Sequence, residues 1–391
     1  MNLAPAAHGH GARPVGDAAL GVYVHIPFCA SRCDYCDFAT WTDRGALIDD
    51  YVAACVTDVE TRVRRGELVE AASVFFGGGT PSLLDAAALL RILDAIPRRA
   101  DAEVTVECNP DSVDPAKLRA YRHGGVNRCS FGAQSMRPHV LAALGRTHDP
   151  AGVARALDAA RDAGIERLNV DLIYGTPGET LEDWSATLDA TLALGPTHVS
   201  AYALTVEPGT PLGVRVAAGC TPAPDDDDQA EKYELADDRL TAAGHHWYEI
   251  SSWARPGDEC RHHLLYWRQG DYLGIGCAAH GHRCGTRTWN VRRPERYVER
   301  IRAAASPVAG AEQLDPATRA EEALALALRT RSGAAVPPGA DAVVTELAEA
   351  GLVRRADDRL VLTRPGRLLG TEVTVRLLAV RAAGPQPVGT R

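Results

Sequence analysis

The chain lacks three features that would place it in other protein classes. No stretch of about 18 apolar residues, the length that crosses a bilayer, occurs in its 391 residues. Basic residues are in deficit, since 42 lysines and arginines face 51 aspartates and glutamates, and the formal net charge of −9 argues against general nucleic-acid binding. Residues 1–19 contain no basic segment followed by an apolar one, so we expect a flexible tail and no secretory signal.

The ten cysteines lack the compact, regular spacing of a disulfide framework. Together with the missing signal, this pattern predicts a location in the reducing cytoplasm, where a cysteine cluster more often binds metal or takes part in catalysis. Four of the cysteines are scattered along the chain: Cys55, Cys108, Cys129 and Cys220. We expect these four to be small buried apolar residues.

Strand-like and helix-like segments alternate between residues 20 and 210. Six strands are predicted, at 21–27, 73–79, 103–109, 128–135, 167–175 and 198–206. Helical segments lie between them, and several end in a glycine that suits a helix terminus. The alternation indicates an α/β fold of parallel βαβ units with right-handed crossovers. This pattern alone fits either an open doubly wound sheet or a partial (βα)6 barrel with its chemistry at the C-terminal ends of the strands.

Three further cysteines, Cys29, Cys33 and Cys36, lie in one short segment directly after the first predicted strand. Three thiolates from a single loop hold a [4Fe–4S] cube by three of its irons, whereas such clusters normally have four cysteine ligands. The fourth iron is then open to another ligand, as the open position is in catalytic zinc sites. A redox pair or a chance cluster of buried cysteines is the alternative.

The Cys-x3-Cys-x2-Cys loop, with Tyr35 before its third cysteine, resembles the signature of the radical S-adenosylmethionine (radical SAM) superfamily. The resemblance implies a partial (βα)6 TIM-like barrel. It also implies that SAM chelates the open iron and is cleaved reductively to a 5′-deoxyadenosyl radical. Under this interpretation Tyr23 and Tyr35 line the cluster and the adenine.

The same resemblance assigns the remaining SAM contacts to polar residues at predicted strand ends. Gly78, Gly79 and Thr80, in the segment GGGTP, match the element that contacts the methionyl amino group, and the glycines would expose backbone N–H groups to a polar head. The other matching residues are Glu107 for the same amino group, Gln134 for the ribose side, Arg146 for the SAM carboxylate and Asp171 for the ribose hydroxyls.

Two groups within the superfamily share this layout, the oxygen-independent coproporphyrinogen III dehydrogenases and the HemW-type heme chaperones. The dehydrogenases usually carry another cysteine two places after the third cluster ligand, where this chain has Phe38. The sequence CDYCDF is typical of the HemW-type group.

A second segment, residues 260–281, also resembles the HemW-type group. It retains Cys260, His262, Tyr266 and Trp267, but His263 replaces the usual asparagine. Imidazole is a common heme-iron ligand and aromatic rings can cover a porphyrin face. We therefore predict His262 as the heme ligand, and His263 leaves the choice open. The alternative is that these residues close the barrel and satisfy one another, and zinc binding by the nearby cysteines and histidines is disfavoured because their spacing matches no compact finger.

The sequence thus predicts a cytoplasmic heme chaperone that holds a [4Fe–4S] cluster, SAM and heme and passes heme to acceptor proteins, respiratory ones among them. Such a chaperone needs an electron donor if SAM is cleaved. The sequence also allows peripheral association with a membrane. The alternative is a coproporphyrinogen III dehydrogenase. The expected domains are a tail at 1–19, a core barrel at 20–245, a heme-motif segment closing the barrel at 246–300, a small helical, winged-helix-like domain at 301–378 and a loose tail at 379–391.

Overall fold

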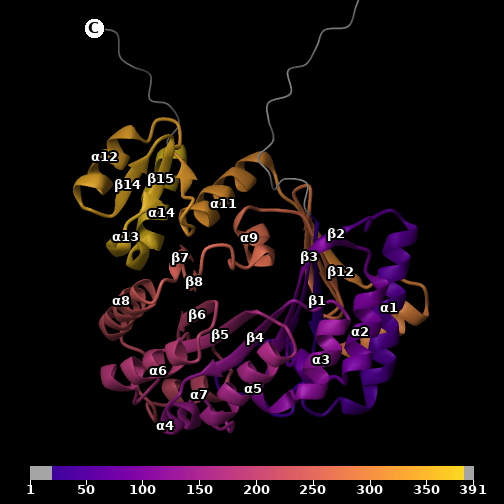
Figure 1. The fold of residues 1–391 in the computed structure, drawn as a ribbon. Helices are drawn as coiled ribbons and strands as arrows, with labels where there is room; N and C mark the ends of the chain where they lie inside the picture. Colours follow the sequence, from indigo (N-terminus) through magenta and orange to yellow (C-terminus); the bar gives the residue numbers. More distant parts are fainter. Residues whose placement is uncertain (1–19, 383–391) are drawn as a thin grey trace, which may run out of the picture.

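The fold is taken from a computed structural model that describes residues 20–382. The tail expected at 1–19, and that at 379–391 beyond Ala382, lie outside the described residues. The central feature is a twelve-stranded sheet with helices along one face (Figure 1). None of the helices in residues 20–382 combines the length and the apolar content that a membrane span needs.

All six predicted strands are present and pair in parallel, in chain order, which confirms the (βα)6 arrangement. They are β1 (Leu20–Ile26), β2 (Ala71–Gly78), β3 (Arg98–Cys108), β4 (Arg128–Gln134), β5 (Arg167–Tyr174) and β6 (His198–Ala203). The connecting segments contain α1 (Ile48–Arg64), α2 (Ala86–Ala95), α3 (Pro115–His123), α4 (Pro138–Ala143), α5 (Pro150–Asp162), α6 (Leu181–Ala193), α7 (Pro211–Ala217) and α8 (Asp226–Ala242).

Local sequence fixes the starts of many of these helices. An Asp-Pro pair begins both α3 and α5: the aspartate side chain, Asp114 or Asp149, accepts a backbone N–H of the first turn, and the proline takes the first helical position. Proline is well suited there because its missing N–H would have no partner in the helix. Helix α6 begins instead with a reciprocal capping box between Thr180 and Asp183.

The two faces of strands β1–β6 differ in character. One face is apolar and fully buried against the helices, with residues such as Val22, Val74 and Val170 in the main core. The other face, called here the interior face, carries mainly polar residues: Tyr23, His25, Ser73, Glu103, Glu107, Asn169, Asp171 and His198. A buried sheet face normally packs apolar side chains, so a polar interior face marks the region where a ligand binds.

The segment predicted at 246–300 joins the two edges of the six-stranded core. Strands β7 (His246–Glu249) and β8 (Ser252–Ala254) extend the sheet beyond β6, whereas β9 (Tyr272–Ile275) pairs in parallel with β1. The connection from β8 to β9 runs from one edge to the other and contains the short helix α9 (Arg261–Trp267; Figure 1). Its contacts lie with Gly21, Ser73 and Glu103, toward the N-terminal ends of β1–β3.

The sheet extends further than the sequence predicted. Beyond β9 come β10 (His280–Arg283), β11 (Thr286–Asn290) and β12 (Val308–Gln313), all antiparallel, and α10 (Pro294–Arg302) packs on α1. Because β12 pairs with β11, a domain boundary at 301 would cut through this sheet. The boundary in the structure lies after Gln313, before α11 (Pro316–Leu328).

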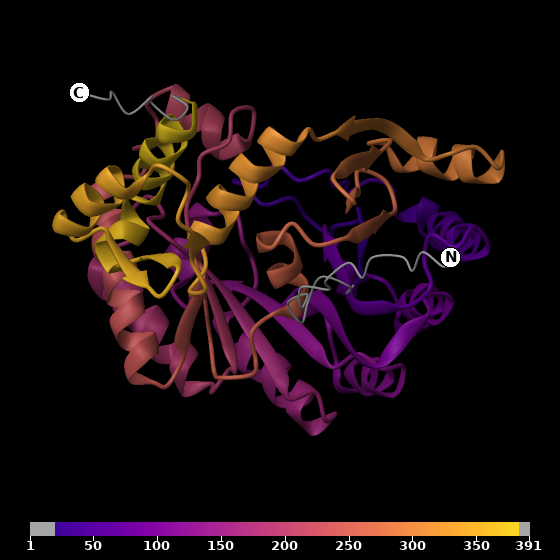
Figure 2. The same cartoon turned by 90° about the horizontal axis from the view of Figure 1, so that it is seen from above.

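The C-terminal part forms its own small domain, visible as the yellow region of Figures 1 and 2. Its elements are α11, β13 (Ala334–Ala335), α12 (Asp341–Glu349), β14 (Val353–Ala356), β15 (Arg359–Leu362), α13 (Arg364–Leu368) and α14 (Gly370–Ala382). Strands β14 and β15 form a hairpin, and the domain has a separate apolar core around Leu328, Leu347 and Leu360. Helix α14 runs to Ala382, so the expected start of the loose tail at 379 is too early.

Candidate functional site

The three cysteines lie on a loop whose two ends are held together next to β1. The backbone of Cys29 donates to the Trp41 carbonyl at 3.1 Å, and Phe28 forms a parallel bridge with Trp41. The middle of the loop is fixed by Asp34, which accepts a hydrogen bond from Arg215 of α7 at 2.7 Å. The loop is therefore held in place by protein contacts at its ends and its centre.

The thiols of this loop suit a cluster. Cys29, Cys33 and Cys36 are all free and half-buried, unlike the buried core cysteines. Burial raises the pKa of Cys29 and of Cys36, and the neighbouring Cys33 adds to both shifts. No three His, Cys, Asp or Glu side chains within residues 20–382 converge on one metal ion.

The glycine run at the end of β2 packs against the cysteine loop. A Cβ on Gly79 would lie 2.7 Å from the Phe28 carbonyl oxygen and 3.0 Å from the Cys29 sulfur, so only glycine fits. The N–H groups of this run were expected to face a polar ligand group, but they are already hydrogen bonded within the protein. Gly79 donates to the Ile26 carbonyl, Thr80 donates to the Phe28 carbonyl, and Gly78 donates to the Glu107 carboxylate at 3.2 Å. The N–H groups of Gly79 and Thr80 extend the β1–β2 pairing instead, and the Thr80 hydroxyl lies 3.7 Å from the Cys29 sulfur.

Glu107 faces the end of the glycine run from the interior face of β3. A Cβ on Gly77 would lie 3.2 Å from its carboxylate, so the side chain passes close over the backbone. Burial and the neighbouring Asp171 raise the pKa of Glu107 to about 7. A positive charge close to this carboxyl group would lower its pKa and favour its ionised form.

Arg146 and Gln134 meet at the C-terminal end of β4. The Arg146 guanidinium donates to the Gly132 carbonyl at 2.5 Å and lies 3.6 Å from the Cys33 sulfur. Gln134 adopts a left-handed backbone with φ 63°, and its side-chain amide folds back over Gly132. The structure thus brings Arg146 to the cysteine loop, where it forms no ion pair with any carboxylate of the described residues.

Asp171 lies on the interior face of β5 and is already hydrogen bonded. Ser130 and the Asn169 amide each donate to one of its oxygens at 2.7 Å. Burial raises the pKa of Asp171, while these two hydrogen bonds lower it. An ionised carboxylate can accept about four hydrogen bonds, so these two leave capacity for a ligand.

The two predicted tyrosines occupy different places. Tyr23 lies on the interior face of β1, half-buried, with its ring stacked on Phe75 at 6.4 Å. Tyr35 packs in a small apolar cluster with Leu144 and Leu212, where burial raises its pKa and Cys33 adds to the shift. Tyr35 thus lies within the cysteine loop, whereas Tyr23 lies on the barrel strand β1.

His25 is a site residue that the sequence analysis missed. Its Nε2 donates to the Ala39 carbonyl at 3.0 Å, so its Nδ1 accepts from the Tyr23 hydroxyl at 3.0 Å. Burial lowers the pKa of His25, which keeps the ring neutral. The ring links β1 to the end of the cysteine loop, and its position two residues after Tyr23 on the same strand face was the available signal.

The block of residues 260–267 is packed against the interior face near the N-terminal ends of the strands. His262 is fully buried, and its two ring nitrogens lie 2.8 Å from the Ser73 and Tyr266 hydroxyls. Burial and the adjacent His263 lower the pKa of His262 to about 3. His263, Tyr266 and Trp267 are half-buried.

Glu103 of β3 holds the start of α9. Helix α9 has no side-chain cap of its own; instead, the buried Glu103 carboxylate accepts the His262 backbone N–H at 3.1 Å, and the Cys260 thiol lies 3.5 Å away. Arg167 lies 4.0 Å from its other oxygen. One buried carboxylate thus satisfies a helix N-terminus that is distant in sequence.

Replacing Glu103 with alanine is expected to lower the free energy of unfolding by about 3–5 kcal/mol, because its partners would stay buried without an acceptor. Denaturant unfolding of the cofactor-free chain measures this. The matched control is Asp101→Ala on the same strand, which removes an exposed pair with Arg261 and is expected to cost less than about 1 kcal/mol. Equal losses in the two variants would show that Glu103 does not hold α9.

The remaining cysteines have separate surroundings. Cys260 contacts Glu103, Cys277 contacts the Tyr51 hydroxyl at 3.5 Å, and Cys284 contacts Asp271 at 3.6 Å. Cys55, Cys108 and Cys129 are buried as predicted. Cys220 is exposed, so its predicted burial is wrong, since it follows the end of α7 in a surface loop.

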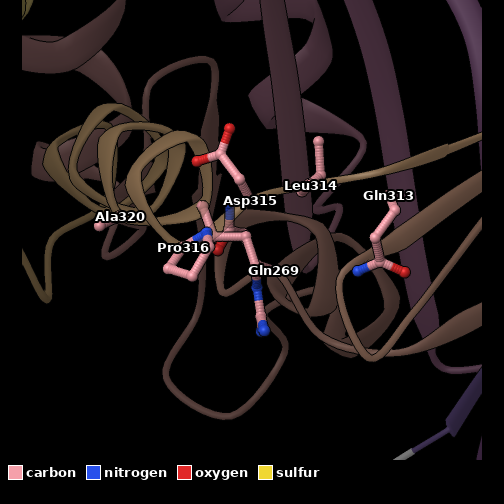
Figure 3. A pocket seen from close by; sticks show the side chains of 7 residues that line it. Gln269, Gln313, Leu314, Asp315, Pro316 and Ala320 are labelled. Atoms are coloured by element: carbon pink, nitrogen blue, oxygen red, sulfur yellow. The ribbon is translucent and has the colours of Figure 1, made fainter.

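A separate hollow of about 630 Å³ lies where β12 leads into α11 (Figure 3). Its lining consists of Gln269, Gln313, Leu314, Asp315, Pro316, Arg319 and Ala320. It contains none of the predicted site residues. The candidate site is therefore the interior of the barrel with the cysteine loop, and this hollow is not part of it.

Comparison with known proteins gives consistent results. The Radical SAM superfamily profile matches residues 23–191. The heme chaperone HemW of Mycobacterium tuberculosis (strain H37Rv) is 44% identical over 382 residues, covering 94% of this chain and 97% of the relative. HemW of Bacillus subtilis (strain 168) is 34% identical over 367 residues, covering 90% and 97%.

Among solved structures, the coproporphyrinogen III oxidase HemN of Escherichia coli, a radical SAM enzyme, superimposes with a TM-score of 0.79. The superposition covers 92% of this chain and 90% of that chain at 24% identity, and it confirms the partial-barrel fold. With the near full-length similarity to the HemW proteins, these findings show that the chain belongs to the HemW heme chaperone family of the radical SAM superfamily.

Proposed function

We propose that this chain is a cytoplasmic heme chaperone that binds heme and delivers it to acceptor proteins, respiratory ones among them. The observation that carries the proposal is the similarity to HemW along 97% of the Mycobacterium tuberculosis relative, at 44% identity. Phe38, two places after Cys36, supports it, since the dehydrogenases resembling this chain usually have a cysteine there.

In this proposal Cys29, Cys33 and Cys36 bind three irons of a [4Fe–4S] cluster and SAM binds the fourth. When bound, the cluster supplies one electron, received from a separate electron donor, for the reductive cleavage of SAM. The half-buried thiols and the oriented cysteine loop support this assignment.

The protein residues around the cluster would bind and orient SAM. The ionised Glu107 carboxylate would accept a hydrogen bond from the methionyl amino group, and Arg146 would pair with the methionyl carboxylate. Asp171 and Gln134 accept and donate hydrogen bonds on the ribose side. Gly78, Gly79 and Thr80 let the ligand approach the backbone beside Cys29, and Tyr23 and Tyr35 provide aromatic surface.

The block of residues 260–267 would supply the heme-binding element. Its two imidazoles and the rings of Tyr266 and Trp267 provide an iron ligand and apolar surface for the porphyrin. The block closes one end of the barrel interior, where His263 lies within electrostatic range of the predicted SAM residue Glu107. Heme and SAM would thus share one interior.

The alternative is a coproporphyrinogen III dehydrogenase. Heme and coproporphyrinogen III both carry propionate carboxylates, so the carboxyl groups of the interior do not distinguish the two functions. Phe38 is the feature that favours the chaperone over the dehydrogenase.

Anaerobic titration of heme into the reconstituted chain tests the proposal. We expect a saturable, one-to-one shift of the Soret band. Incubation with coproporphyrinogen III, SAM and a reductant should produce no protoporphyrinogen IX. Absence of saturable heme binding together with formation of protoporphyrinogen would replace the chaperone with the dehydrogenase.

A further inference from the structure

A series of buried hydrogen bonds runs along the interior face from the start of α9 to Asp171 on β5. We propose that its central member, His198, is a positioning residue that orients Asn169 and, through Asn169, holds the Asp171 carboxylate ready to accept the ribose hydroxyls of SAM. His198 would not touch SAM itself, and its role depends on the proposed SAM site. None of the sequence motifs contains this residue.

Both ring nitrogens of His198 have a hydrogen-bond partner. His198 lies opposite Asn169 in the parallel pairing of β5 with β6, and its Nδ1 lies 2.6 Å from the Asn169 side-chain oxygen. Its Nε2 lies 2.7 Å from the Tyr248 hydroxyl. Because an amide oxygen can only accept, Nδ1 carries the proton and Nε2 accepts from Tyr248. Burial lowers the pKa of His198 well below its ordinary value, so the ring stays neutral in this one tautomer.

Tyr248 supports this tautomer from the other side of the ring. Its hydroxyl oxygen accepts the backbone N–H of Cys260 at 3.3 Å, and its own proton is then donated to His198. Tyr248 and His198 are both buried, and their rings meet edge to face with centroids 5.4 Å apart. Cys260 directly precedes α9, so the backbone at the start of this helix helps to fix the proton on Nδ1 of His198.

The amide orientation of Asn169 follows from the proton on His198. With its oxygen held by His198, Asn169 turns its NH₂ group toward Asp171 and Ser130 and lies 2.7 Å from an acceptor on each. Reversing the amide would place two acceptors against each other at Asp171 and two donors against each other at His198. His198 therefore excludes the reversed amide.

The Asp171 carboxylate is oriented by the result. Asn169 donates to one of its oxygens and Ser130 donates to the other, each at 2.7 Å. Two donors on two different oxygens fix the plane of the carboxylate, as outer partners do for the ligands of a metal. The bonding capacity that remains accepts protons only, which suits the hydroxyl groups of a ribose.

Two variants of the full, cluster-loaded chain distinguish the two ring nitrogens of His198. In His198→Asn the amide nitrogen lies as many bonds from Cα as Nδ1 does, so it can still donate to Asn169. In His198→Gln the amide group lies at the distance of Nε2, so it can reach Tyr248 but not Asn169. His245→Asn is the matched control, because it removes the hydrogen bond of another buried histidine, to the Pro196 carbonyl.

The measurement is the dissociation constant of SAM relative to that of its 2′,3′-dideoxyribose analogue. The wild type should favour SAM about tenfold or more, because a site built to bind a hydroxyl group rejects the analogue that lacks it. His198→Asn should keep this preference, whereas His198→Gln should reduce it to about twofold or less, as a hydrogen bond to a charged group is lost. His245→Asn should melt at a lower temperature and keep the full preference.

A measurement on the wild type covers the case in which His198→Gln does not fold. Nitrogen-15 NMR of the imidazole groups should show His198 as the Nδ1–H tautomer, unchanged between about pH 5 and 8, where exposed histidines titrate. The Nε2–H tautomer, or a protonated ring in this range, would contradict the positioning role.

The remaining outcomes separate this role from the proposed function. A wild-type preference for SAM in His198→Gln, or its loss in folded His198→Asn, would show that His198 does not act through Asn169, and only the positioning role would fail. If the wild type does not prefer SAM over the analogue, the proposed ribose contact of Asp171 fails and the positioning role with it. Heme titration of the same preparations reports on the chaperone function independently of either result.

Discussion

Replacing Cys33 with serine is expected to give a chain that folds but assembles no [4Fe–4S] cluster. Cys33 is the central one of three thiols on a loop whose ends are fixed by Phe28 and Trp41. Because one sulfur is replaced and the contacts at the loop ends are kept, the fold should survive. A serine hydroxyl is a much poorer ligand for soft iron–sulfur centres than a thiolate.

The measurement is the iron and sulfide content after anaerobic reconstitution, with the visible absorbance of the cluster. Cys220→Ser is the matched control, since Cys220 is exposed and lies far along the chain from the loop. It should hold the wild-type amount of iron. A Cys33→Ser variant with unchanged iron content would show that the ligand assignment is wrong.

SAM should bind about eightfold more tightly at pH 7.5 than at pH 6, because Glu107 must ionise to accept a strong hydrogen bond from the methionyl amino group. Burial and Asp171 raise the pKa of Glu107 from its ordinary 4.5 to about 7, so the carboxyl is mostly protonated at pH 6. The range ends at pH 7.5 because free α-amino groups titrate at about 7.7–8.0 and would add a pH dependence of their own. For the SAM-free chain the sign is opposite: the folded state becomes less favoured as the pH rises from 4.5 toward 7.

Equilibrium binding of SAM to the cluster-loaded chain across this range measures the effect. Glu107→Gln keeps an acceptor for the Gly78 N–H but cannot ionise. It is expected to bind SAM about 10- to 100-fold more weakly at pH 7.5, the loss of one charge-assisted hydrogen bond, and with no dependence on pH. An unchanged pH profile in this variant would remove Glu107 from the SAM site.

The sequence predicts the six-stranded core well because each strand is a short apolar run between helix-forming segments. The first strand was expected at 21–27 and is Leu20–Ile26, and the third was expected at 103–109 and ends at Cys108. Strands β9–β12 were missed. Strand β9, for example, has only four residues, and it joins the sheet through pairing with β1, some 250 positions earlier in the chain.

The orientation of groups within the site was harder to predict than which residues belong to it. The sequence motifs predicted that Glu107, Arg146 and the cysteines share one site. They did not reveal that the N–H groups of Gly79 and Thr80 continue the pairing of β1 with β2. Nor could they separate His262 from His263, because the orientation of a seven-residue helix is set by its tertiary contacts. Glu103, which fixes that orientation, lies on β3 and carries no motif.

Heme transfer tests the central claim most directly. The heme-loaded, cluster-containing chain is mixed anaerobically with an apo heme protein, the two are separated, and the heme on each is measured. The account predicts that heme moves to the acceptor faster from the loaded chain than from a non-specific carrier such as albumin, and that the acceptor becomes functional. Heme that stays on the chain, or moves no faster than from albumin, would contradict the chaperone function.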